Sequence, residues 1–361
     1  MKILAFMMSI LSFSCNSIEK IYVGTKSIDG IFAINLDAKT GALTKVYQKG
    51  DVQNPGYLTF SPDKQFLYTV AGDDKIRAYK IAVNGELIFL NEKSSTGKNP
   101  CHIETSKTGK AVVVANYGSG DTTVISVGTD GAFSGTPRNH SHKKYSIPGK
   151  HRSQSRPRAH NVQMSPNGHY VFISDLGTDK IVIYKFDDNF EKLTRSKPEY
   201  TDVPASSGPR HFTFHPNGRF AYGINELNST VSAYHYSGEG KLTLKASVST
   251  KPKSWSGYNN CADIHVHPNG KFLYGSNRGN NSIVIYSINQ KDGSLSLVGH
   301  ESSRGNWPRN FAISPSGEYL LVANQKSNDI FSFRINPQTG KLSYTGKKLE
   351  LPAPICLKFY K

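Results

Sequence analysis

Short stretches of alternating apolar and polar residues follow one another along most of the chain. A run such as FHPNGRFAYGIN (214–225) contains a Pro-Asn-Gly turn followed by an alternating segment. Period-two alternation bounded by Gly, Pro and Asn is typical of β-strands joined by tight turns. We find no long stretch with a 3.6-residue period, so the pattern predicts many strands and little helix.

The turn-and-strand stretch recurs, which indicates a repeat architecture. The copies read FSPDKQFLYTV (60–70), TSKTGKAVVVAN (105–116, degenerate), MSPNGHYVFISD (164–175), FHPNGRFAYGIN (214–225), VHPNGKFLYGSN (266–277) and ISPSGEYLLVAN (313–324). Counted between turn prolines, with Lys107 in the equivalent place of the degenerate copy, the intervals are 45, 59, 50, 52 and 47 residues. Each interval has room for four antiparallel strands, the unit called a blade in β-propellers.

Six copies are complete, and the seventh is divided between the two ends of the chain. ICLKFYK (355–361) resembles the first strand of a copy, and residues 21–46 supply the other three strands. One four-stranded sheet cannot bury both faces, whereas a closed ring of sheets does so and leaves no free edge. We therefore predict an all-β fold, a seven-bladed β-propeller over residues 20–361, with the N- and C-terminal strands sharing one blade.

Composition agrees with this fold and narrows the partners. The 361 residues include 19 Tyr, 18 Phe and 32 Gly, which suits aromatic-rich strands separated by tight turns. The net charge of +17 favours anionic partners, but the basic residues are scattered, apart from a run between Arg138 and Arg158. No nucleic-acid-binding motif is present, so we expect a small anionic ligand and no nucleic acid.

The first fifteen residues have the form of an export signal. Lys2 is followed by an apolar run from Ile3 to Phe13, which is too short to span a bilayer as a mature helix, and then by Cys15. Residues 11–15 (LSFSC) resemble a bacterial lipoprotein signal, in which the cysteine is acylated after cleavage. The alternatives are ordinary cleavage after Ser14 and an uncleaved start to the fold. We expect export to the periplasm or cell envelope, with any membrane contact through the lipid anchor, and a monomer.

The remaining cysteines and the histidines indicate no metal or redox centre. Cys101, Cys261 and Cys356 are far apart and lack metal-ligand spacing, so we expect small buried residues. His215 and His267 precede the turn proline where other copies have Ser, which predicts turn-capping groups. No His/Asp/Glu cluster has metal-ligand spacing and no Gly-x-Ser-x-Gly motif is present. We predict neither a required metal nor a cofactor nor a serine triad.

Positions counted from each turn proline separate scaffold from candidate site. Two residues after the proline Gly recurs, and nine residues after it Asn or Asp recurs, which predicts a turn and a corner held by side-chain bonds. Six residues before and ten residues after the proline, the residue type varies from copy to copy, as a site requires. In an antiparallel hairpin these two positions share one end of the sheet. The candidates are His160, Arg210, His211, Glu226, Asp263, His265, Arg278, Arg309 and Gln325.

These residue types predict a cationic pocket around one carboxylate. Arginine binds carboxylate or phosphate through two parallel hydrogen bonds. Glu226 could activate water as a general base, His160 or His265 could relay protons, and an arginine could stabilise an oxyanion. Nearby arginines should keep Glu226 ionised and weakly basic, which suits an activated carbonyl such as that of a lactone.

The same segments resemble a known family, the bacterial 6-phosphogluconolactonase and fungal carboxymuconate-cyclase propellers. The resemblance rests on PRAHNVQMSPNG, GPRHFTFHPNGRFAYGINEL, ADIHVHPNGKFLYGSNRGNNSI and WPRNFAISPSGEYLLVAN. It implies a seven-bladed propeller and places His160, Arg210, Glu226 and Arg278 at the family's active-site positions, with His265 at a further recurrent position. The chain departs from the family pattern at Arg158, which replaces a His, and at Asp263, which replaces a Glu.

Three functions remain open at this stage. The first is a lactonase-like hydrolase that opens an anionic sugar lactone, with Glu226 as base and with Arg210 and Arg278 holding the anion. The second is a cycloisomerase that closes a carboxylated muconate with the same arginines. The third is a non-catalytic propeller at the cell envelope that binds a sugar acid or a protein.

Overall fold

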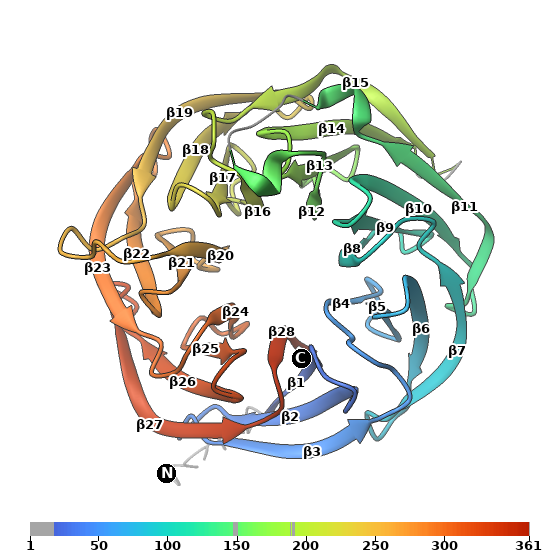
Figure 1. Ribbon diagram of the computed structural model, residues 1–361. Helices are drawn as coiled ribbons and strands as arrows, with labels where there is room; N and C mark the ends of the chain where they lie inside the picture. The colour runs from blue at the N-terminus through green and yellow to red at the C-terminus, as the bar shows by residue number, and fades with distance from the viewer. Residues whose placement is uncertain (1–17, 147–150, 188, 190–191, 361) are drawn as a thin grey trace, which may run out of the picture.

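The computed structural model describes residues 18–146, 151–187, 189 and 192–360, which form seven four-stranded antiparallel sheets arranged in a ring (Figure 1). The predicted seven-bladed β-propeller is confirmed. Two short 3-10 helices, η1 (Lys143–Tyr145) and η2 (Arg152–Gln154), are the helical elements of the described residues. The predicted signal segment, residues 1–15, lies outside them. In the described part of the chain, no helix is long and apolar enough to cross a membrane.

The blades follow chain order around the ring, and each begins with its innermost strand. The first three complete blades are β4 (Leu58–Phe60), β5 (Phe66–Val70), β6 (Lys75–Ile81), β7 (Leu87–Ser94); β8 (Pro100–Thr105), β9 (Ala111–Asn116), β10 (Asp121–Val127), β11 (Phe133–Ser141); β12 (Ala159–Met164), β13 (Tyr170–Asp175), β14 (Lys180–Asp187), β15 (Lys192–Asp202). The next three are β16 (Pro209–Phe214), β17 (Phe220–Asn225), β18 (Thr230–Tyr236), β19 (Leu242–Ser249); β20 (Asn260–Val266), β21 (Phe272–Arg278), β22 (Ser282–Ile288), β23 (Leu295–Ser302); β24 (Pro308–Ile313), β25 (Tyr319–Asn324), β26 (Asp329–Ile335), β27 (Leu342–Glu350).

The seventh blade joins the two ends of the chain, as the divided repeat predicts. Its order is β28 (Pro354–Phe359), β1 (Ile18–Thr25), β2 (Ile31–Asp37), β3 (Leu43–Lys49). β28 pairs antiparallel with β1, with Val23 opposite Leu357, and Figure 1 shows the red C-terminal strand beside the blue N-terminal one. The innermost strand therefore comes from the opposite end of the chain, which closes the ring without a free sheet edge.

The turns have the structure that the repeat predicts. Gly218 and Gly270, two residues after the turn proline, have φ of 69° and 73°, a region that glycine enters without steric cost. His215 and His267 cap these turns: each Nδ1 accepts a hydrogen bond from the backbone N–H of the residue two further on, at 3.1 Å. Each Nε2 also contacts the turn carbonyl of the following blade, at 2.8 and 2.9 Å, so the cap also ties neighbouring blades together.

The hydrophobic core lies between neighbouring blades. One cluster, for example, packs Tyr222 and Ile224 of β17 against Leu273 and Tyr286 of the next blade. Tyrosines on the second strands also form hydrogen bonds between blades. The hydroxyl of Tyr222 donates to Gly293 O, in a turn of the next blade, at 2.9 Å. Equivalent bonds join Tyr274 to Gly340 and Tyr22 to Gly85. Because buried tyrosine hydroxyls need a partner, these bonds help to set the spacing of the blades.

The long basic insertion packs in part against the entrance of the central channel. His142 is buried, and its Nδ1 lies 2.7 Å from Asp175 Oδ2, at the corner position of the adjacent blade. The guanidinium of Arg158 lies 4.9 Å from the ring centre of Tyr117, which lines a pocket at that entrance. The described part of this insertion is therefore docked on the scaffold.

Candidate functional site

A repeated β-bulge places the candidate residues at the mouth of the channel. In the β16–β17 pair, Pro209 is opposite Asn225 and His211 is opposite Ile224, so Arg210 is the extra residue. His160 and Arg309 occupy the same bulged position in their blades. A bulge turns a side chain away from the face that strand alternation would give it. The bulge thus brings position six before the turn proline to the channel mouth, although strict alternation would place it on the core face.

Ten residues after the proline, the second strand ends at the same mouth: Arg278 is the last residue of β21, and Glu226 directly follows β17. The backbone N–H of Glu226 donates to Gly208 O at 2.7 Å, which fixes this residue beside Arg210. The two positions from several blades line a pocket of about 310 Å³, which we call the mouth pocket. Its lining includes Lys26, Tyr57, Tyr117, His160, Arg210, His211, Glu226, Arg278 and Arg309.

Glu226 is held by two arginines at the centre of this pocket. Its Oε2 accepts a hydrogen bond from Arg210 Nε at 2.9 Å and forms an ion pair with Arg278 Nη2 at 2.7 Å. Burial by itself would raise the pKa of the Glu226 carboxyl, but Arg278, Arg210 and Arg309 outweigh it and lower that pKa. Both bonding guanidiniums also donate to backbone carbonyls, Arg210 to Ala262 O and Arg278 to Cys261 O. Glu226 is therefore an ionised carboxylate with Oε1 left without a hydrogen bond among the described residues.

Among the described residues that line the pocket, Arg309 is the guanidinium without an ion pair, and the exposed Lys26 also lines the pocket without one. Within the described residues the Arg309 guanidinium makes no hydrogen bond or ion pair, although it lines the pocket. Burial, and then the charges of Arg210 and Arg278, lower the pKa of Arg309 to about 9. An anion bound to Arg309 would form a charge-assisted hydrogen bond and would reduce the repulsion among the neighbouring guanidiniums, so binding there is favourable.

Two histidines complete the wall of the mouth pocket. His160 is buried, and its Nδ1 has no hydrogen-bond partner within the described residues. Burial, with Arg210 and His211 beside it, lowers the pKa of His160 well below its ordinary value, so the ring is neutral at pH 7. Its ring centre lies 5.3 Å from that of His211. Because buried polar groups are normally paired, His160 Nδ1 is available to a ligand.

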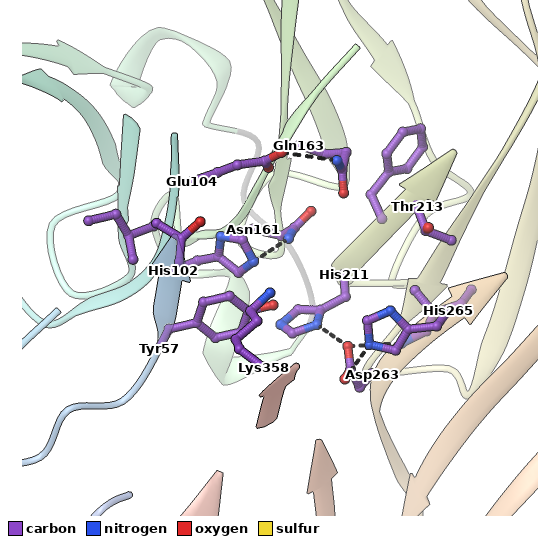
Figure 2. Close-up of a pocket in the computed structure, with 14 residues that line it drawn as sticks. Tyr57, His102, Glu104, Asn161, Gln163, His211, Thr213, Asp263, His265 and Lys358 are labelled. Atoms are coloured by element: carbon purple, nitrogen blue, oxygen red, sulfur yellow. Dashed lines mark hydrogen bonds and ion pairs between the residues drawn. The ribbon is translucent and has the colours of Figure 1, made fainter. Parts of the chain in front are cut away.

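A second cavity follows the same innermost strands further along the channel. It has a volume of about 230 Å³, and we call it the channel cavity (Figure 2). Tyr57 and His211 line both spaces and therefore lie between them. Glu104 lines the channel cavity and accepts hydrogen bonds from Gln163 Nε2 and from the Met164 backbone N–H, both at 3.2 Å. Burial raises the pKa of Glu104 to about 7.

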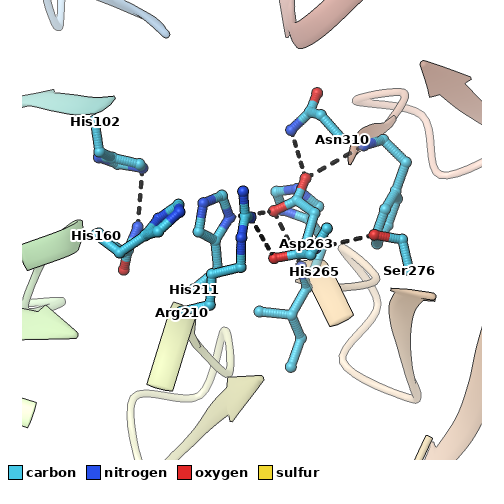
Figure 3. Close-up of polar contacts among 12 residues, drawn as sticks. His102, His160, Arg210, His211, Asp263, His265, Ser276 and Asn310 are labelled. Carbon is cyan, nitrogen blue, oxygen red and sulfur yellow. Dashed lines mark hydrogen bonds and ion pairs between the residues drawn. The ribbon is translucent and has the colours of Figure 1, made fainter. Parts of the chain in front are cut away.

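Asp263 organises one side of the channel cavity (Figure 3). Its Oδ1 accepts from His211 Nδ1 at 2.7 Å, and its Oδ2 accepts from His265 Nε2 at 2.9 Å and from Asn310 Nδ2. Burial alone would raise the pKa of the Asp263 carboxyl, but His265 and His211 hold it well below its ordinary value. His211 therefore uses Nδ1 as the donor, because its partner is an ionised carboxylate.

The structure brings some of the predicted residues together and separates others. His160, Arg210, His211, Glu226, Arg278 and Arg309 line the mouth pocket. Asp263 and His265 do not; they lie one and three residues beyond the mouth position Ala262 and line the channel cavity. Gln325 lines neither space, and its buried Oε1 has no partner among the described residues. The nine predicted residues therefore do not all line one pocket. Asp263 and His265 lie deeper because a strand advances about 3.3 Å per residue along the channel, whereas Gln325 stands at the same offset as Glu226 and yet lines neither space.

The arginines differ in the partners they already have. Arg210 and Arg278, which the sequence predicts to hold an anion, each pair with Glu226 and donate to a backbone carbonyl, whereas the guanidinium of Arg309 makes no hydrogen bond or ion pair within the described residues.

Of the residues that line the channel cavity, the sequence patterns singled out His211, Asp263 and His265, although the repeat contained a signal for the others as well. Counted back from the turn proline or its equivalent, positions five and three before it lie on one strand face because alternation has a period of two. These positions are Tyr57, His102, Asn161, His211, Asp263 and, three before, Thr59, Glu104, Gln163, Thr213, His265. Lys358 of β28 completes the second group.

Among the described residues, no group of three or more His, Cys, Asp or Glu side chains could hold a metal ion. Cys101, Cys261 and Cys356 are free thiols. Cys261 and Cys356 are buried, and Cys101 is half-buried, as small scaffold residues would be.

The described residues thus form a ring of seven blades with a cation-rich pocket at the channel mouth. Residues 20–359 match the sequence model of the family described as lactonase, seven-bladed β-propeller. The chain belongs to this family.

Individual relatives agree over most of the chain. A 6-phosphogluconolactonase of Formosa agariphila is 38% identical over 293 residues, which cover 79% of this chain and 82% of the relative. A 6-phosphogluconolactonase of Bacillus subtilis is 33% identical, with 94% and 97% covered. The solved structure of a periplasmic gluconolactonase of Pseudomonas aeruginosa superposes with a TM-score of 0.89 at 30% identity, covering 95% of this chain and 99% of that one.

Proposed function

We propose that this protein hydrolyses an anionic sugar lactone in the mouth pocket. The observation that carries the proposal is the charge balance: Lys26, Arg210, Arg278 and Arg309 surround a single carboxylate, Glu226. A substrate with a carboxylate or phosphate group would relieve the repulsion among these cations. Arg309, which has no partner in the described structure, is the residue we assign to that group.

The chemistry we assign to the pocket is attack by water on the lactone carbonyl. The water oxygen bonds to the carbonyl carbon, the ring C–O bond breaks, and the water proton ends on the departing ring oxygen. Glu226 Oε1, which has no hydrogen bond among the described residues, accepts the proton first. An arginine donor stabilises the oxyanion of the tetrahedral intermediate, and His160 Nδ1 hydrogen-bonds the substrate. A weak base suffices here because a lactone carbonyl is activated.

The relatives support this class of reaction. Two with at least 33% identity over most of the chain are named 6-phosphogluconolactonases, and one solved relative is named a gluconolactonase. A phosphorylated or otherwise anionic aldonolactone is therefore the substrate class to try first.

The direct experiment follows hydrolysis of glucono-δ-lactone and 6-phosphoglucono-δ-lactone by the purified protein, with the buffer rate subtracted. We expect acceleration of the phosphorylated lactone and loss of the excess rate in Glu226→Gln. No rate above buffer on either lactone would contradict the proposal. Saturable binding of the sugar acids without turnover would instead favour the non-catalytic propeller.

We also propose that the chain is exported and that Cys15 is the anchor point. The support is the apolar run of residues 3–13 before Cys15, together with the periplasmic relative at 30% identity. Cell fractionation with wild-type protein and Cys15→Ser tests this. We expect the wild type in the membrane fraction and the variant in the soluble envelope fraction; cytoplasmic recovery of both would contradict export.

A further inference from the structure

Five blades enter their innermost strand through a proline, and the residue before each proline has a positive φ. The values are 48° for Asn54, 50° for Asn99, 62° for Gly208, 39° for Ala353 and 70° for Trp307. This left-handed conformation is natural for Gly, tolerated by Asn, and unfavourable for a bulky side chain. The repeat thus provides its own comparison: the other four blades use Gly, Asn or Ala, and the fold does not require a tryptophan here.

The indole of Trp307 lies beside the mouth pocket. Its ring centre is 5.3 Å from the guanidinium carbon of Arg278, whose Nη2 forms an ion pair with Glu226 at 2.7 Å. Arg309, which lines the pocket, is two residues further along the chain. The backbone holds this placement: Trp307 N–H donates to Asn281 Oδ1, and Trp307 O accepts from Gln325 N–H, both at 3.0 Å.

Further aromatic side chains extend from Trp307. The ring of Tyr258 is nearly parallel to the indole, at 10° with 6.3 Å between centres, and Tyr258 is 63% exposed. The indole N–H of Trp255 donates to Tyr258 O at 3.3 Å. Trp255 and Trp307 are the two tryptophans of the chain, and both contact Tyr258 in this aromatic group beside the mouth pocket. The exposed Lys326 ammonium lies 3.4 Å from the Trp307 ring centre.

We propose that Trp307 and Tyr258 form a carbohydrate-binding subsite, which takes a neutral sugar unit attached to the lactone that reacts in the mouth pocket. Aromatic side chains offer apolar area with little loss of conformational freedom, and the C–H face of a sugar ring is apolar while its edge carries hydroxyls. Lys326, whose ammonium lies over the indole face in this structure, moves off that face when the sugar binds and then supplies a donor for its hydroxyls. The unfavourable backbone of Trp307 is the kind of local cost that proteins retain at binding sites. This inference rests on the proposed function and names its substrate class as the lactone of an oligosaccharide acid.

The test compares cellobiono-δ-lactone with glucono-δ-lactone, in the wild type and in Trp307→Asn. Asn is the matched replacement because Asn54 and Asn99 occupy the equivalent position in other blades. We expect the wild type to prefer the disaccharide lactone in kcat/KM, and Trp307→Asn to lower this preference about tenfold. Phe89→Asn, which removes an exposed aromatic on β7, should leave the preference unchanged. An unchanged preference in Trp307→Asn would overturn the subsite.

Binding and stability measurements separate this proposal from the proposed function. In Trp255→Phe, where Trp307 is the one indole left, titration with cellobionate should change the fluorescence in a saturable way and gluconate should act more weakly. That result would support the subsite even if neither lactone were hydrolysed, and a flat titration would overturn it. We expect Trp307→Asn to melt at the same temperature as the wild type or higher; a loss of several degrees would assign Trp307 to the fold instead.

Discussion

Two glutamates face the same channel, and their pKa values are shifted in opposite directions. In the mouth pocket, Arg278 and Arg210 overcome the effect of burial and lower the pKa of Glu226. In the channel cavity, burial dominates and raises the pKa of Glu104 to about 7, because its hydrogen-bond donors there are an amide and a backbone N–H. The same residue type thus serves as a permanent anion in one space and as a titrating group in the other. Charged partners, and not depth alone, decide which carboxylate can take part in chemistry at neutral pH.

The two spaces also differ in how their other charges are used. The mouth pocket keeps an excess of guanidiniums, and Arg309 has no partner in the described structure. In the channel cavity, the buried carboxylate of Asp263 orients His211 and His265. These two side chains of the fold therefore already pair with its negative charge. We therefore expect substitutions in the mouth pocket to affect activity, and substitutions in the channel cavity to affect stability.

Removal of the Glu226 charge should have the largest effect. Glu226→Gln should lower kcat/KM on the phosphorylated lactone by roughly 100-fold or more, the range for loss of a general base. The matched control is Glu104→Gln, the same substitution in the other space, which should retain activity within about threefold on the same scale. Equal losses in both variants, measured by lactone hydrolysis at pH 7, would mean that the comparison between the spaces is wrong.

Loss of Arg309 should come next. Arg309→Met should raise KM for the phosphorylated lactone about 10- to 100-fold, as expected for one charge-assisted contact worth about 1.5–3 kcal/mol. The effect on unphosphorylated glucono-δ-lactone should be smaller. Lys341→Met, which removes an equal charge from an exposed turn, is the control. An equal KM increase on both lactones would show that Arg309 does not select the anionic group.

Glu104 should make stability depend on pH. Its folded-state pKa of about 7 lies above the unfolded value of 4.5, so between these values the folded chain binds the extra proton. Stability should therefore fall as pH rises from 4.5 through 7, by about 1–3 kcal/mol at most. Urea unfolding between pH 5 and pH 8 measures this difference. Glu104→Gln should flatten this part of the profile, and an identical slope in wild type and variant would count against a buried neutral Glu104.

Lys358 should have the smallest effect. Its charge lowers the pKa of Glu104 without an ion pair between them within the described residues, and its ammonium lies 4.7 Å from the Tyr57 ring centre. Lys358→Met should shift the pH midpoint of the stability change upward, by roughly a few tenths of a pH unit for charges not in contact. A downward shift in the same urea series would show that the two side chains do not interact as described.

The sequence by itself determined the architecture, because the features that specify a blade are local. Period-two alternation, turn glycines such as Gly218 and Gly270, and the capping histidines His215 and His267 all act within one copy or between adjacent copies. The spacing of the turn prolines set the number of blades, and the divided copy predicted the pairing of β28 with β1. The offsets also placed Arg210 and Glu226 at one end of the same sheet, since antiparallel pairing alone requires it.

Only the tertiary structure decided which side chains meet. Arg278 reaches Glu226 from a neighbouring blade, and Arg309 is left unpaired. These outcomes depend on the bulges and on the spacing between blades, which cannot be read from the position of a residue relative to its turn proline. The separation of Asp263 and His265 from the mouth pocket likewise depends on depth along the channel. Trp307 occupies the repeated position before a proline but differs in residue type from the other blades. Its φ and its neighbouring side chains, which only the structure gives, are the basis for assigning it to a subsite. The repeat is specified by contacts between residues that are close in sequence, whereas the pocket is formed by residues that are distant in sequence.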